Sequence, residues 1–325
     1  MKRILQIIAF LLVMAGLYFL GGRGPVRPVD SGEGYAYQVI DDEGNVVKLK
    51  AKPHRIMTTH FHLDNLVLGV VPQERMIAVS KTMLDPTVSY VTADEVSQPE
   101  KVPQVTLEKV VALKPDLIIS RSSYGKDKLQ CFRDLGIPVY ISEMPGDVEE
   151  IKEKITGIAA VTGEEESGKR LNEKIDATLQ KIEEAIPGER QFTKSCALVS
   201  KMNQEYGGKG STFDDLCAQA KIRNAVADIG IMNGQTISEE TILKANPDYL
   251  VLSESWEIKH GNGDTYKDEF YDHPAFQCLK AVQQHQVIYL KDKHIYASNQ
   301  NCVWAIRRLA NMAYGNIFPE EKKFF

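Results

Sequence analysis

The chain has 325 residues, of which 43% are hydrophobic and 26% are charged, which is ordinary for a globular protein and argues against a disordered or fibrous chain. This length accommodates two domains, each with its own apolar core. The formal net charge is -5, and no run of lysine and arginine is interleaved with aromatic residues, so nucleic acid is not an expected partner.

The first 34 residues differ from the rest of the chain. Lys2 and Arg3 precede an uncharged apolar run at 4–20, and a Gly/Pro-rich stretch follows it. This order is typical of an export signal and a linker, so we expect a periplasmic or other extracytoplasmic location. The run is slightly long for a cleaved signal and slightly short for a span of about 20 residues, which leaves cleavage and retention as a membrane anchor equally open. No cysteine lies near the run, so a lipid anchor on cysteine is not expected.

Residues 35–145 alternate between strand and helix patterns. Apolar and polar residues alternate over 35–59 around the turn 41–45, which predicts a hairpin and then a strand at 55–59. The elements predicted next are helix 64–70, strand 76–80, a helix ending at Lys114, strand 116–120, helix 126–136 and strand 138–142. These strands are short and almost wholly apolar, which predicts a parallel sheet covered on both faces.

The pattern changes at residues 146–188, which carry apolar residues at helical spacing and no strand signal until Pro187-Gly188 ends the segment. Residues 189–325 return to the alternation, with strands at 195–200, 249–253 and 286–290 and a final helix at 302–315. The predicted fold class is therefore α/β, with two similar units joined by the helical segment. The five cysteines, at 131, 196, 217, 278 and 302, have no zinc-type spacing and are interpreted as small buried thiols, with a disulfide left open.

One element occurs in both units: "LEKVVALKPDLIIS" at 107–120 and "EETILKANPDYLVLS" at 239–253. Proline disfavours helix for the residue before it, so Lys114 and Asn246 should end two helices that each lead into a buried strand. Glu108 and Glu240 fall in the first turns of these helices, where the helix dipole favours an acid by about 0.3–1 kcal/mol without any partner. Alternatively, two acids at equivalent rims of two lobes are a docking pair for basic residues of another protein.

Several motifs together carry a family resemblance. They are an Asp-Asp-x-Gly hairpin before "KPHRIM", the two Glu…Pro-Asp elements, the central helical segment, a Gly-Ser loop entering "TFDDLCAQAKIRNAV", and a C-terminal helix after "ASNQNCVWAI". Over residues 37–315 the chain resembles the extracytoplasmic substrate-binding proteins of ABC importers for iron-siderophores, haem and cobalamin. The resemblance implies two Rossmann-like lobes joined by a long helix, with the ligand in the cleft between them. It also implies that Glu108 and Glu240 meet arginines of the permease dimer.

Loops that follow the strands supply the candidate ligand-binding residues, because ligands of open α/β sheets bind outside the carboxyl ends of the strands. In the first lobe these are His60, His62, Arg121 and Tyr124, and in the second they are Tyr206, Trp256, His294 and Tyr296. Such loops pair aromatic surfaces with a few polar groups, which suits a large, partly apolar chelate.

Four of these residues have more specific alternatives. His60 and His62 alternate in a segment expected to be extended, so both can face one metal ion, although no third ligand lies nearby in the sequence. In the other two interpretations, these histidines contact the edge of a chelate or simply line the cleft. Arg121 can neutralise a carboxylate, a propionate or an anionic siderophore, or it is a surface charge. Tyr296 is either an axial ligand of haem or an aromatic wall.

The sequence lacks the phosphate-binding motifs GxxxxGK[ST] and GxGxxG, the nucleophile motif GxSxG and the zinc-binding motif HExxH, so no enzyme activity is expected. The predicted function is capture of a metal chelate, iron-siderophore first and haem or cobalamin next, by a monomer without an intrinsic cofactor that delivers it to the permease dimer. The alternatives are a metal-ion-binding protein or metal-dependent hydrolase that uses His60 and His62, and a receptor-like sensor. The expected boundaries are 1–34 for the signal or anchor with its linker, 35–145 and 189–325 for the lobes, and 146–188 for the connection.

Overall fold

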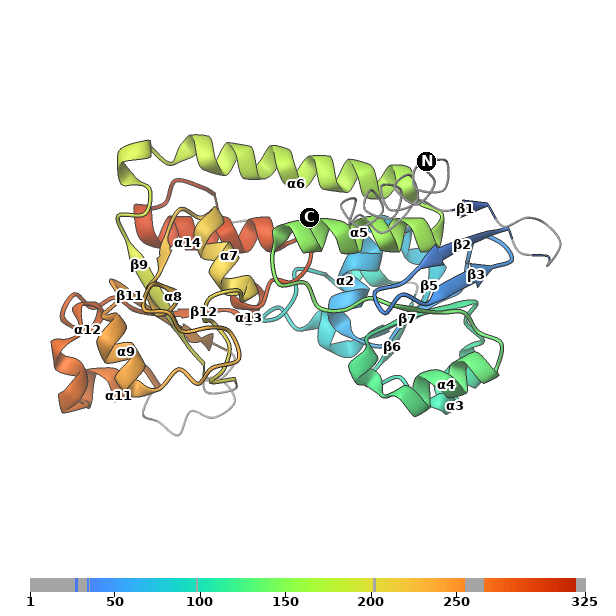
Figure 1. Cartoon of the computed structure of the whole chain (residues 1–325), viewed down its shortest axis with the longest axis horizontal. Coiled ribbons are helices and arrows are strands. Elements are labelled where there is room, and N and C mark those ends of the chain that lie inside the picture. Colours follow the sequence, from blue (N-terminus) through green and yellow to red (C-terminus); the bar gives the residue numbers. More distant parts are fainter. Residues whose placement is uncertain are drawn as a thin grey trace, which may run out of the picture.

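The computed structural model describes residues 27–28, 34, 36–97, 99–200, 203–254 and 266–319. They form two α/β lobes side by side, and helix α6 (Glu165–Ala185) runs along one long edge of the molecule from one lobe to the other (Figure 1). The predicted two-lobed α/β fold is confirmed. No helix of the described residues is both long and apolar enough to cross a membrane, and the apolar run at 4–20 lies outside them.

The first lobe is built on a five-stranded sheet in which all neighbouring strands are parallel. Across the sheet the strands are β6 (Glu100–Val102), β5 (Met76–Ser80), β4 (Ile56–Thr58), β7 (Leu117–Ser120) and β8 (Val139–Ile141). Along the chain, β5 and β6 are added on one side of β4, and β7 and β8 are then added on its other side. The reversal between β4 and β7 is the place where sheets of this kind bind ligands.

Helices cover both faces of this sheet, as the short apolar strands predict. Ile118 and Ile119, adjacent in β7, belong to two different apolar clusters, because successive side chains of a strand point to opposite faces. Helices α2 and α5 pack on one face, and α3 and α4 pack on the other. The helical elements of this lobe are α2 (Phe61–Val70), η2 (Gln73–Arg75), η3 (Lys81–Leu84), η4 (Asp94–Val96), α3 (Leu107–Leu113), η5 (Ser122–Tyr124), α4 (Lys126–Asp134) and α5 (Val148–Thr162).

The predicted hairpin is confirmed and forms a small antiparallel sheet of β1 (Arg27–Pro28), β2 (Tyr37–Ile40) and β3 (Val46–Leu49). Its turn is closed by the Asp41 carboxylate, which accepts hydrogen bonds from two backbone N–H groups of the turn at 2.8 and 3.0 Å. Asp42 beside it forms a buried ion pair with Lys154 of α5. The hairpin is therefore fixed to the first lobe by charge as well as by packing.

The second lobe repeats the plan with a four-stranded parallel sheet. Its strands, in order, are β10 (Arg223–Asn224), β9 (Ser195–Val199), β11 (Tyr249–Ser253) and β12 (Val287–Leu290). The order reverses between β9 and β11, which is the second expected point of ligand contact. The helical elements are η6 (Gly188–Arg190), α7 (Thr212–Gln219), α8 (Ala225–Asp228), α9 (Glu239–Ala245), α11 (Tyr266–Asp272), η7 (Pro274–Cys278), α12 (Lys280–Gln283), α13 (Asp292–Ile295) and α14 (Cys302–Tyr314).

The repeated Pro-Asp element has one structure in both lobes. Helices α3 and α9 end at Lys114 and Asn246, as predicted, and both residues have left-handed backbone, with φ of 48° and 41°. After each proline, the aspartate accepts hydrogen bonds at the start of the neighbouring strand. Asp116 accepts from two backbone N–H groups just before β4, both at 2.8 Å, and Asp248 accepts from that of Ser195 in β9 at 2.9 Å. The element therefore pairs amides that the sheet would leave unsatisfied.

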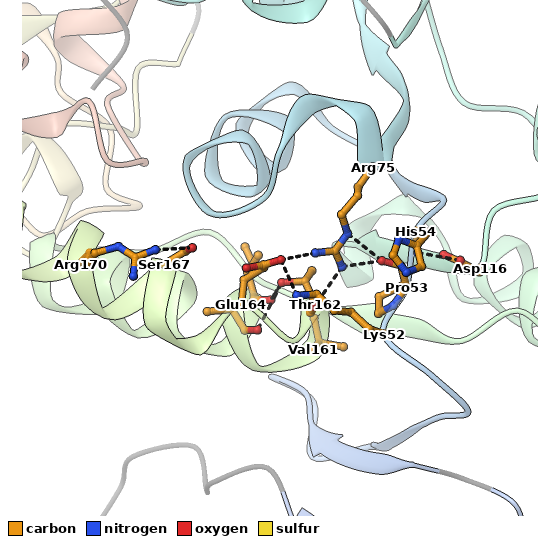
Figure 2. A network of polar contacts seen from close by, with 12 residues as sticks. Lys52, Pro53, His54, Arg75, Asp116, Val161, Thr162, Glu164, Ser167 and Arg170 are labelled. Atoms are coloured by element: carbon orange, nitrogen blue, oxygen red, sulfur yellow. Dashed lines mark hydrogen bonds and ion pairs between the residues drawn. The ribbon is translucent and has the colours of Figure 1, made fainter.

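The connecting segment consists of two antiparallel helices, α5 and α6, and their turn is clamped to the first lobe (Figure 2). The guanidinium of Arg75 donates hydrogen bonds to the carbonyls of Pro53 and Thr162, the latter at 2.7 Å, and pairs with Glu164 at 2.5 Å. Lys52 pairs with the same oxygen of Glu164 at 2.7 Å. Helix α6, about 30 Å long, therefore starts as a fixed part of the first lobe.

Cysteine burial differs from the prediction at two positions. Cys196, Cys217 and Cys302 are buried as expected, whereas Cys131 and Cys278 are exposed, because they lie on the outer faces of surface helical turns. All five are free thiols.

Candidate ligand-binding cleft

The first wall of the candidate site lies where β4 and β7 end. Thr59 and Ser120 join these ends, with their hydroxyl oxygens 2.8 Å apart. His60 and Arg121 follow directly, and His62 is the second residue of α2. The structure therefore brings three of the four residues predicted for the first lobe to the expected point of the sheet.

The sequence predicted that the two histidines alternate on an extended segment, and this prediction is wrong. His60 caps α2, its Nδ1 accepting a hydrogen bond from the His62 backbone N–H at 3.3 Å, so the chain is already helical at Phe61. The imidazole rings stack with centroids 5.1 Å apart and planes inclined by 14°. Across the described ranges, no third histidine, cysteine or carboxylate joins them in a group suited to a metal ion. This geometry favours contact with a flat or bulky ligand over ligation of a bare ion.

Arg121 supplies the positive charge of this wall. Its Nε is buried and has no hydrogen-bond partner within the residues described. Burial, and to a smaller extent nearby positive charge that includes Arg121, lowers the pKa of His60 to about 4 and that of His62 to about 3. Both imidazoles are therefore neutral at pH 7, which leaves Arg121 as the one cation among these three residues.

Tyr124, the fourth residue predicted for this lobe, belongs to a different environment. Its hydroxyl donates a hydrogen bond to the Val105 carbonyl at 2.7 Å, and its ring stacks on Phe132 with centroids 5.9 Å apart. Both contacts lie in the apolar cluster under α3 and α4. The turn η5 thus directs Arg121 and Tyr124 to different parts of the lobe.

The second wall is formed by segments that follow the carboxyl ends of β9 and β12. Ser200 follows β9, and its hydroxyl is 2.9 Å from that of Tyr296. The rings of Tyr296 and Tyr206 are 5.0 Å apart, centroid to centroid. The Tyr206 hydroxyl accepts a hydrogen bond from the Phe213 backbone N–H at 3.1 Å and donates to the Ile295 carbonyl at 3.3 Å. These two tyrosines therefore form one aromatic surface that hydrogen bonds hold in place.

The structure does not bring His294 to this aromatic surface. His294 lies edge-on to Tyr90 of the first lobe, with ring centroids 6.0 Å apart, and lines a cavity of about 30 Å³ with Trp304 and Arg308. Burial and the surrounding cations lower its pKa to about 3. Trp256, the remaining candidate, lies outside the described residues.

A buried polar seam joins the lobes beside these walls. The Gln300 side chain donates a hydrogen bond to the Asn65 carbonyl of α2 at 2.6 Å, and the Lys293 backbone N–H donates to the Thr87 carbonyl at 2.9 Å. A Cβ atom at Gly69 would lie 2.6 Å from the Gln300 side-chain nitrogen, so this approach requires glycine there. Together with α6, the seam limits how far the lobes can separate.

Asp64 is a residue of this region that the sequence analysis did not single out. Its carboxylate accepts hydrogen bonds from the Thr58 hydroxyl at 2.5 Å and from the Ser80 backbone N–H at 2.8 Å, and so ties the ends of β4 and β5 to α2. Burial raises its pKa to about 7. The available signal was an acid within an apolar helix, "FHLDNLVLGV".

We expect Asp64 to make stability depend on pH. Its native pKa of about 7 exceeds the ordinary 3.8, so the folded protein keeps a proton that the unfolded chain loses. The free energy of unfolding should fall between about pH 4 and pH 7, with a slope from this group of up to about 1.4 kcal/mol per pH unit. Urea unfolding of the wild type and Asp64→Asn across this range should show the variant gaining relative stability as pH rises. A difference that stays constant with pH contradicts the prediction.

The two proposed docking acids occupy equivalent places. Glu108 and Glu240 lie in the first turns of α3 and α9, both exposed, and the side chains of Thr106 and Ser238 cap these helices. Each helix ends beside the amino ends of the sheet strands, so its first turn lies toward the opposite edge, where the candidate site is. Helices α3 and α9 lie on the side of the molecule away from α6 (Figure 1).

One family model, that of the periplasmic binding proteins, matches residues 64–294, which is most of the chain. The chain belongs to this family. The family membership predicted from the sequence is therefore confirmed.

Two individual relatives match 95% and 77% of this chain. A Bacillus subtilis protein named as an uncharacterized ABC transporter substrate-binding lipoprotein, YvrC, is 26% identical over 327 residues, covering 95% of this chain and 97% of the relative. The Fe(3+)-citrate-binding protein YfmC of the same bacterium is 21% identical over 256 residues, 77% of each chain. 

Solved structures of low sequence identity share the fold. A possible iron-binding periplasmic solute-binding protein from Staphylococcus epidermidis has a TM-score of 0.69 at 20% identity, covering 81% of this chain and 100% of that one. The periplasmic haem-binding protein RhuT from Roseiflexus has a TM-score of 0.66 at 20% identity, covering 82% and 99%.

Proposed function

We propose that this periplasmic binding protein captures an anionic metal chelate between its lobes and delivers it to the permease of an ABC importer. The observation that carries the proposal is the unsatisfied guanidinium of Arg121: its buried Nε has no partner within the described residues. Arg121 lies near two neutral imidazoles at the point where the strand order of the first sheet reverses. A carboxylate or another anionic group of a chelate satisfies that guanidinium. The Tyr206 and Tyr296 rings of the second lobe offer the apolar contact.

The relatives support this class of cargo. The names of two similar proteins specify Fe(3+)-citrate and haem, and a third structural relative, from Helicobacter pylori, is described with nickel and histidine bound. All three cargoes are metal complexes that present an organic surface. Iron-siderophore remains the first candidate for this chain, with haem and cobalamin next, and the protein binds them without turnover. A hydrolase or bare-metal site on His60 and His62 is the weaker candidate, because no third histidine, cysteine or carboxylate of the described residues joins them.

Titration of the purified protein with ferric citrate, ferric hydroxamate and catecholate chelates, haem and cobalamin, read by absorbance and tryptophan quenching, tests the proposal. We expect saturable binding of one chelate at one per chain. Arg121→Gln should weaken that binding about 10-fold to 150-fold, as expected for a lost charge-assisted hydrogen bond. Stoichiometric uptake of a bare divalent ion, with no chelate bound, overturns the proposal.

Tyr124→Phe is the matched control for Arg121→Gln, since both residues belong to the same short loop. The Tyr124 hydroxyl bonds to Val105 and stands apart from the paired histidines and Arg121. We expect unchanged chelate affinity and a loss of about 1 kcal/mol in the free energy of unfolding. A large loss of affinity in this variant would place Tyr124 in the cleft.

A further inference from the structure

A second cavity, of about 890 Å³, lies far from the candidate cleft. It opens between strand β3, the last turns of α3 and α4, and the segments that lead into β7 and β8. It is therefore at the amino edge of the first sheet, whereas His60 and Arg121 are at the carboxyl edge. We call it the basic groove.

The walls of the basic groove are strongly positive, although the chain as a whole carries a net charge of -5. Its lining has one acid, Asp116, whose carboxylate accepts backbone hydrogen bonds before β4. Its cations are Lys48, Lys50, Lys52, Lys114 and Arg133, of which Lys52 is paired with Glu164 outside the lining. A wall of this charge selects an anionic occupant.

Apolar side chains at the mouth of the groove are unusually exposed. Val46 and Val111 are each 53% exposed, and Leu135 is 51% exposed. They come from three separate elements, β3, α3 and the end of α4, and all line the groove. The occupant that matches both features is amphiphilic, with anionic groups beside apolar ones.

In a chain that keeps its N-terminal apolar run, only a short stretch of chain separates the membrane from this groove. Strand β1 begins at Arg27 and pairs with β2, which in turn pairs with β3 in the groove wall. The run 4–20 ends only seven residues before β1, and seven extended residues reach about 25 Å. The sheet that forms the groove wall is thus held within a short distance of the bilayer surface.

We propose that, in a chain that keeps its N-terminal apolar run, the basic groove binds anionic phospholipid headgroups of the membrane. Lysine and arginine side chains contact the phosphates, while Val46, Val111 and Leu135 contact the boundary of the acyl region. Such a contact would hold the binding protein at the surface that also contains its permease. The lipid contact involves the last turn of α3, whereas Glu108 lies in its first turn. Lipid binding and docking to the permease therefore use different sides of the lobe.

Hydrogen–deuterium exchange of the full chain in nanodiscs tests this proposal. In discs with phosphatidylglycerol, the amides of residues 45–53 and 110–116 should exchange at least about fivefold more slowly than in phosphatidylcholine discs, a factor that one cation near an anionic surface supplies. Lys50→Glu with Arg133→Glu should abolish this difference while chelate affinity stays unchanged, and added salt should reduce it in the wild type.

A matched control reverses two exposed cations of α6, Lys169→Glu with Lys181→Glu, and should keep the lipid-dependent protection. Equal amide exchange in the two kinds of disc overturns the proposal. An acidic protein segment would then be the candidate occupant of the basic groove. Protection that survives the reversal at Lys50 and Arg133 overturns it as well, because the groove cations would then not be its cause.

Discussion

A chain in which Glu108 and Glu240 are both replaced by lysine should bind its chelate normally and support no uptake. Both acids are exposed at the first turns of α3 and α9, one on each lobe, and neither is among the residues of the two candidate walls. Reversal of both charges turns attraction to basic permease residues into repulsion at two points. Tryptophan quenching measures chelate affinity, and a reconstituted transporter measures uptake. The two assays together separate an effect on binding from an effect on docking. Single replacements should reduce uptake partly.

The control for this experiment is Glu165→Lys with Glu166→Lys. These acids are also exposed in the first turn of a helix, so the change in net charge and in the helix-dipole interaction is the same. They lie at α6, on the far side of the molecule from α3 and α9 (Figure 1). Uptake should be retained. Uptake by the Glu108/Glu240 variant, or an equal loss in the control, contradicts the docking role.

The largest stability loss is expected from Lys154→Met. Lys154 is 4% exposed and pairs with Asp42, whose carboxylate also accepts a hydrogen bond from the Glu143 backbone N–H at 2.8 Å. Removal of the lysine leaves a buried carboxylate without its counter-charge, which costs about 3–5 kcal/mol. Urea unfolding at pH 7 measures the change. Asp42→Asn added to Lys154→Met should recover part of the loss, because the unpaired charge is gone.

Lys152→Met is the matched control on the same helix. Lys152 also pairs with two carboxylates, Glu149 at 3.1 Å and Asp176 at 2.7 Å, but these acids are 76% and 55% exposed. Water already solvates them, so we expect a loss below about 1 kcal/mol. Similar losses in the two lysine variants would show that burial does not determine the strength of the Lys154 pair.

The Lys154 pair and the Arg75 clamp were invisible in the sequence, since their partners are 112 and 89 residues away. Local signals, by contrast, were reliable. The caps at Thr106 and Ser238, the helix ends at Lys114 and Asn246, and the hairpin turn at Asp41 all depend on hydrogen bonds or steric limits within a few residues. Such limits act on the chain wherever it folds.

The sequence by itself determined the order of elements, the two-lobed α/β architecture and the family, because periodicity, proline positions and the paired Glu…Pro-Asp elements are properties of short segments. It also located the loops at the carboxyl ends of the strands. Only the tertiary structure decided which environment each residue of those loops enters. Arg121 and Tyr124, or His294 and Tyr296, are close neighbours in the chain, yet a single helical turn sends their side chains into different environments. That direction depends on packing between distant segments, which no local pattern encodes.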